Sequence, residues 1–196
     1  MVISNVIRWL GLIAVLGGLF RATMTPLELA WGVDNTPALL LGGIAGSLFI
    51  ILGTAGIYLY QAEKVGVTGF IGFILTLIGN VLVCSLVIVS LFVHTALQNP
   101  MLLEQDLPGP IGTIRLVMLI TMSLGYLILG LVTFRAKLLP GWPALLMMLF
   151  VFLPFVPFTG DYLAAVWGII YMGLGWTIWS KSSLIESKPY VGNIDV

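Results

Sequence analysis

Charge, cysteine and histidine are all scarce in this sequence. Charged residues make up 8% of its 196 residues, whereas a soluble domain averages roughly 25%. The 8 basic and 8 acidic residues cancel, so the chain has no basic excess with which to neutralise the phosphates of a nucleic acid. These shortages exclude a soluble globular domain, a disordered chain and a nucleic-acid-binding protein.

The few reactive side chains do not form a recognisable catalytic or metal-binding set. Cys84 alone excludes an internal disulfide framework or a CxxC site, and His94 alone excludes bis-His haem ligation. Ser90 and His94 are one helical turn apart, but no acid is placed by spacing to orient the histidine. Neither a phosphate-binding loop nor an H-E-x-x-H motif occurs. We therefore expect no enzyme activity, no metal and no cofactor.

Long apolar runs dominate what is present. Hydrophobic residues make up 60% of the chain and the mean hydropathy is +1.14. A membrane-spanning helix needs about 20 largely apolar residues, and the sequence offers six such runs: 3–20, 38–60, 67–97, 111–134, 142–158 and 162–179. The sequence therefore predicts an all-α, polytopic membrane protein, with residues 1–196 forming one domain of six transmembrane helices in a single bundle.

The basic residues indicate how this bundle is oriented. With six spans, one side of the membrane carries most of the lysines and arginines: Arg8, Lys64, Arg135, Lys137, Lys181 and Lys188. The other side carries Arg21 and Arg115, which places Arg21 in the loop after the first span. Because basic loops stay in the cytoplasm, we expect both termini to be cytoplasmic in a plasma (inner) membrane.

Residues 134–142 read Phe-Arg-Ala-Lys-Leu-Leu-Pro-Gly-Trp. A basic residue, then Leu-Pro, then a Trp that opens the next helix resembles a loop found in small multi-pass bacterial inner-membrane proteins of uncharacterised function. This resemblance covers only that segment. It implies a prokaryotic inner membrane and assigns no functional residue.

The run 67–97 has one polar face. Thr76, Asn80 and Cys84 follow one another at intervals of four residues, so they share a helix face that we expect to look into the bundle. One interpretation is helix packing, in which Asn80 bonds to a neighbouring helix. The other is that Asn80 lines a ligand cavity or a polar path, with Thr76 and Cys84 beside it.

Charged and polar residues also gather on the predicted outer side. Arg115 lies one turn into its helix, and an ion pair with Glu104 or Asp106 would hold the preceding loop over the bundle. Alternatively, His94, Arg115 and Asp161 form a polar mouth that meets a ligand or partner. Asp161 is also placed to cap the last helix.

Two stripes of large side chains allow a similar pair of interpretations. Met118, Met122 and Tyr126 share a helix face, and Trp167 and Tyr171 are one turn apart. They either pack the bundle or form the wall of an apolar pocket for a quinone, carotenoid or acyl chain.

These features favour a non-catalytic membrane protein that acts as an accessory subunit or binds a lipid-like small molecule. The alternative is a small transporter or channel that uses a polar path near Asn80. Expected partners are membrane lipids and other membrane subunits or a second copy of the chain.

Overall fold

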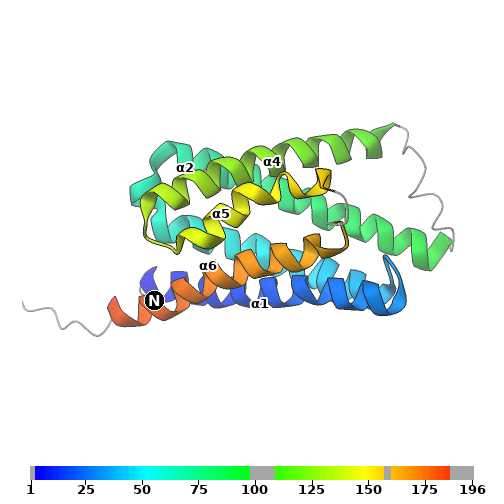
Figure 1. Cartoon of the computed structure of the whole chain (residues 1–196), viewed down its shortest axis with the longest axis horizontal. Coiled ribbons are helices and arrows are strands. Elements are labelled where there is room, and N and C mark those ends of the chain that lie inside the picture. The colour runs from blue at the N-terminus through cyan, green and yellow to red at the C-terminus, as the bar shows by residue number, and fades with distance from the viewer. Residues whose placement is uncertain (1–2, 98–108, 157–159, 186–196) are drawn as a thin grey trace, which may run out of the picture.

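The structure is a computed structural model that describes residues 3–97, 109–156 and 160–185. Every regular element in these ranges is helical (Figure 1). Five of them are α-helices: α1 (Ile3–Trp31), α2 (Gly46–Phe92), α4 (Pro110–Ala136), α5 (Gly141–Phe150) and α6 (Leu163–Ile185). Two π-helical segments, η1 (Ala38–Ala45) and η2 (Val93–Leu97), extend α2 at its ends. Two short 3-10 turns, η3 (Leu153–Phe155) and η4 (Gly160–Tyr162), separate α5 from α6.

Helix α2 folds back on itself at Gly66. Residues 38–97 would form a straight helix of about 90 Å, which is three times the thickness of a bilayer core. Gly66 interrupts it with φ 55° and ψ −150°, a conformation that only glycine adopts readily. The first arm, residues 46–65, then packs against the second arm, residues 67–92. Tyr58 stacks on Phe73 across the two arms, with ring centroids 4.7 Å apart.

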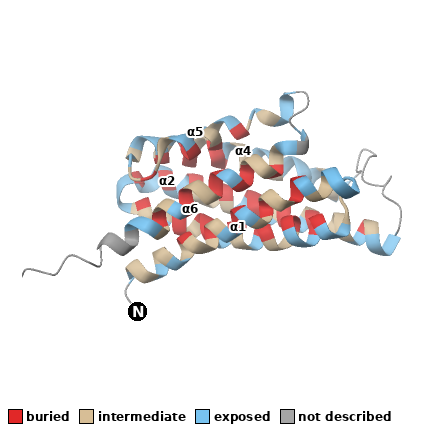
Figure 2. Cartoon of the chain, turned by 60° about the horizontal axis from the view of Figure 1, so that its bottom comes forward, coloured by how far each residue is buried: buried red, intermediate tan, exposed pale blue. Residues whose placement is uncertain are grey.

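Glycines allow the helices to approach closely. In α1 and α6, which run antiparallel, the backbone at Gly18 touches that at Gly168. A Cβ on Gly53 of the first arm would lie 2.7 Å from Ala14, and one on Gly79 of the second arm 2.9 Å from Met122. Small residues at such crossings are typical of membrane bundles, where close van der Waals contact drives association. Buried residues accordingly gather where the helices face one another (Figure 2).

The outward faces of the helices are apolar and exposed. Leu48, Val81, Leu116 and Trp176 are each about half exposed, as expected of side chains that lie against lipid tails rather than water. Four helical segments are long and apolar enough to cross a membrane: Ile3–Trp31, Ala38–Leu97, Pro110–Ala136 and Leu163–Lys181. These segments indicate a membrane protein. The predicted all-helical fold is confirmed, but the predicted set of six spanning helices is only partly matched.

The first predicted span is too short. We expected a helix over 3–20 followed by a loop, but α1 continues to Trp31 and includes Arg21 and Pro26. Proline is tolerated inside membrane helices because neighbouring groups satisfy the carbonyl that it leaves free. The placement of Arg21 in a loop was therefore wrong.

The fifth predicted span is too long. We expected 142–158, but α5 ends at Phe150. Pro154 lacks an N–H, and its ring would clash with the carbonyl four residues earlier, which is that of Phe150. The chain continues instead through the 3-10 turn η3.

Candidate functional site

A buried polar cluster lies at the centre of the bundle. Thr54 of the first arm, Asn80 of the second arm, Tyr126 of α4 and Tyr171 of α6 are all almost fully buried. The Thr54 and Tyr171 hydroxyl oxygens are 2.8 Å apart. The Asn80 amide donates to both at 3.4 Å and accepts from the Tyr126 hydroxyl at 3.5 Å. The cluster therefore ties together four helical segments.

The other members of the predicted polar face take less part. Thr76 is buried and donates at 2.8 Å to the carbonyl of Gly72 in its own helix. Cys84 is also buried. Of the three residues, Asn80 is therefore the one that the structure joins to other helices. A second buried polar contact, which sequence reasoning missed, runs from Gln61 Nε2 to Thr133 Oγ1 at 2.7 Å.

A cavity of about 300 Å³ lies between the second arm, α4, η3 and α6. Its deep wall consists of buried residues such as Val83, Val87 and Trp167. Its outer edge is formed by Leu119 and Pro154, which are exposed. The remaining lining residues are mostly apolar: Arg21, Leu86, Ser90, Met118, Met122, Phe150, Leu163 and Ala164. The cavity thus opens on the outer surface of the bundle.

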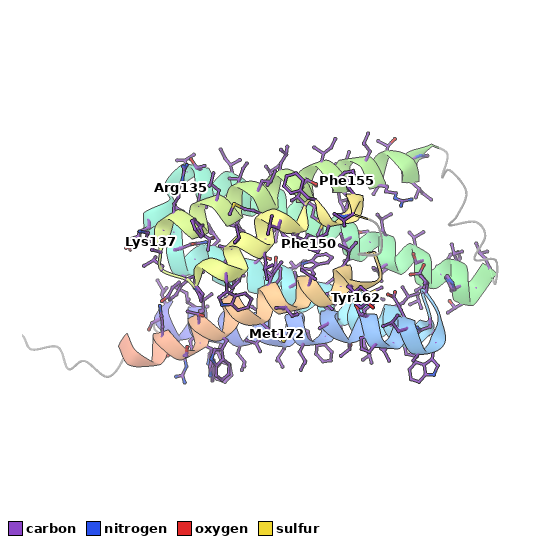
Figure 3. The ribbon with its side chains drawn as sticks, viewed as in Figure 1. Arg135, Lys137, Phe150, Phe155, Tyr162 and Met172 are labelled. Atoms are coloured by element: carbon purple, nitrogen blue, oxygen red, sulfur yellow. The ribbon has the colours of Figure 1, made fainter. Side chains whose placement is uncertain are left out.

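The cavity exists because two elements leave the bundle incompletely filled. In α4 the buried residues begin at Gly125, so the first half of this helix packs loosely. Helix α5 stops at Phe150, and the chain beyond it does not continue as an α-helix. Phe150 closes the inner end, with its ring centroid 5.6 Å from those of both Tyr126 and Trp167. Figure 3 labels Phe150 at this point, between α5 and α6.

Sequence reasoning named part of this cavity. Met118, Met122 and Trp167 line it, while Tyr126 lines a smaller adjoining space of about 60 Å³. Tyr171 instead belongs to the polar cluster. The pocket interpretation of the two stripes therefore has a physical counterpart, although part of each stripe also packs the bundle.

Arg21 is the charged residue that reaches the cavity. Its side chain is 8% exposed. Nη1 donates to the carbonyl of Gly42 at 3.3 Å, and the guanidinium lies 4.2 Å from the centroid of the Trp167 ring. Nε has no hydrogen-bond partner. The sequence signal for its place is the stretch after it, residues 22–31, in which Glu28 is the one charged residue.

The predicted outer residues are not joined into one site by the described part of the chain. His94 is half-buried, and its Nδ1 lies 3.2 Å from the carbonyl of Ser90. Arg115 is exposed on α4. Glu104, Asp106 and the side chain of Asp161 lie outside the described residues, so the ion pair, the cap and the polar mouth stay predictions.

Within the described ranges no group of three or more His, Cys, Asp and Glu residues is placed to hold a metal ion. No protein-family model, curated protein or solved structure matches this chain. Its function must therefore be argued from the cavity itself.

Proposed function

We propose that the protein is a non-catalytic, multi-pass protein of a prokaryotic inner membrane that holds a lipid-like small molecule in the cavity beside Trp167. The observation that carries this proposal is the cavity, which is apolar, partly enclosed and open on the lipid-facing side of the bundle. Ligand pockets of roughly 300–1,000 Å³ with a few polar groups are typical of small-molecule sites.

We further propose that the chain crosses the membrane six times. The two arms of α2 count separately, since each is long enough to cross. Helix α5 is about 15 Å long, which is half the thickness of the apolar core, so this passage needs more of the chain than α5 alone. Arg135 and Lys137 lie at the end of the bundle opposite Phe155 and Tyr162 (Figure 3). Basic residues at that end favour cytoplasmic termini.

The alternative, transport along a polar path at Asn80, has less support. The amide of Asn80 and the hydroxyls of Thr54, Tyr126 and Tyr171 bond to one another in a buried cluster. Such mutual bonding stabilises helix packing and leaves little polar surface for a passing solute.

Native mass spectrometry of the protein, extracted gently from its own membrane, tests the proposal. We expect a discrete small-molecule adduct of lipid-like mass. Ser90→Phe places a ring in the cavity and should remove the adduct. Ser85→Phe is the matched control, because Ser85 lies on the same helix but is exposed and does not line the cavity.

Two results would count against binding. An adduct that survives in Ser90→Phe would place the molecule elsewhere. A second polypeptide at fixed stoichiometry, with no adduct, would favour an accessory subunit instead.

A further inference from the structure

The guanidinium of Arg21 has incomplete partners for a buried charge. Nη1 bonds to one carbonyl and the guanidinium stacks on one indole, while Nε bonds to nothing. Glu28, seven residues further along α1, acts on Arg21 through its charge but forms no bond with Nε. A cation in a low-dielectric interior is costly unless an anion or several acceptors face it. Stacking on Trp167 offsets only part of that cost. A bound anion that accepts from the guanidinium would supply the hydrogen bond to Nε that Glu28 does not.

The shape of the cavity indicates what carries that anion. The charge is confined to one end, since Arg21 lies at the buried wall and Leu119 and Pro154 form the exposed edge. A molecule that fits would have an acidic head inside and an apolar tail leading toward the lipid. The volume, about 300 Å³, lies at the lower limit for ligand pockets and favours one chain over the two chains of a phospholipid.

Resting on the function proposed above, we propose that the ligand is a single-chain amphiphile with a carboxylate head, bound to Arg21. A carboxylate is planar and accepts two parallel hydrogen bonds from a guanidinium edge. The bond to Gly42 uses Nη1, and the buried Nε has no partner within the protein. The tail runs past Met118 and Met122 toward Leu119.

Quenching of tryptophan fluorescence tests this inference. The purified protein is placed in nanodiscs of zwitterionic lipid and titrated with 9,10-dibromostearate or its methyl ester, which have the same tail. Trp167 lies at the cavity wall, so the quenching that is lost in Trp167→Phe reports binding there. We expect the acid to bind roughly ten- to a hundredfold more tightly than the ester.

The Arg21→Gln variant should bind the acid as weakly as the ester. The control is Arg135→Gln, which should behave as wild type, because Arg135 is exposed in the last turn of α4 and does not line the cavity. If Arg21→Gln does not fold, the comparison of acid and ester on the wild-type protein decides alone. If the acid and the ester bind the wild-type protein with equal affinity, the ligand does not need a carboxylate head, and the further inference is wrong while the proposed function stands. No saturable quenching of Trp167 by either compound would overturn the proposed function itself. A single-chain phosphate monoester that displaces the acid at lower concentration would also overturn the carboxylate.

Discussion

The hydroxyl of Thr54 bonds in two directions. It donates to the carbonyl of Ile50 in its own helix at 2.7 Å and lies 2.8 Å from the Tyr171 hydroxyl of α6. Thr76 on the second arm is equally buried but bonds only within its own helix. These two threonines therefore differ in their hydrogen bonds to other helical segments: Thr54 bonds to Tyr171 and Asn80, whereas no such bond is formed by Thr76.

We expect Thr54→Val to lower the free energy of unfolding by about 1 kcal/mol more than Thr76→Val, because hydrogen bonds between membrane helices are worth about that much. Reversible unfolding in mixed micelles measures both variants. Equal losses would show that the hydrogen bonds of Thr54 to Tyr171 and Asn80 add no stability.

For single residues, the sequence predicted that Asn80 points into the bundle but not that Arg21 lies within a helix. Spacing of four residues identifies a helix face, and polar residues on a membrane helix turn inward. The position of a charged residue within the bilayer depends on what its neighbours offer. Trp167 and the Gly42 carbonyl, which receive Arg21, are 146 and 21 residues away in the sequence.

Among the helices, α2 depends on one backbone conformation. Gly66 has a positive φ and no atom within 4 Å of the position where a Cβ would lie. Gly160 also has open space at that position but no positive φ. Neither position has a steric clash, so comparing alanine substitutions at Gly66 and Gly160 isolates the cost of the backbone conformation at Gly66.

We expect Gly66→Ala to destabilise the protein by about 1–3 kcal/mol, the usual cost of a residue forced into such a conformation. Gly160→Ala should change stability by less than about 0.5 kcal/mol. Thermal unfolding of the two variants in detergent compares them. A wild-type midpoint for Gly66→Ala would mean that the turn does not require glycine.

The crossing of α1 and α6 has a different requirement. A Cβ on Gly168 would collide with the carbonyl oxygen of Gly18, which belongs to the backbone and cannot rotate away. At Gly141 the nearest atom is 3.2 Å away and belongs to the side chain of Phe134.

We therefore expect Gly168→Ala to lower the free energy of unfolding by about 1–3 kcal/mol. Gly141→Ala should lower it clearly less. The same unfolding assay measures this difference. A smaller loss at Gly168 than at Gly141 would contradict the close crossing.

Both corrected helix ends involve proline, and their outcomes are opposite. Pro26 lies inside α1, whereas Pro154 follows the end of α5. Each proline lacks the N–H that would bond to the carbonyl four residues earlier. The sequence shows this loss, but it does not show whether a neighbouring element supplies another donor to that carbonyl. For this reason the apolar runs predicted the helices well and their ends poorly.

For the whole molecule, orientation is the property that most needs a measurement. Val33 and Lys64 are both exposed and lie near opposite ends of the bundle. Cys84 is buried, so single cysteines can be introduced in a Cys84→Ala background.

We expect Val33→Cys to react with a membrane-impermeant maleimide in intact cells, and Lys64→Cys to react only after lysis, because the basic end stays in the cytoplasm. Labelling is read by the mass shift of the purified protein. The reverse pattern would invert the proposed topology, and labelling of both from outside would contradict a six-crossing arrangement.

The sharp reversal at Gly66 also has a consequence for biosynthesis. Only one residue departs from helical geometry between the two arms, so the arms can meet as soon as both leave the ribosome. The contact between Tyr58 and Phe73 is one that the two arms form with each other and not with lipid. We expect the arms to enter the translocon side by side as one hairpin, and a chain truncated within the second arm to leave the first arm without its insertion partner.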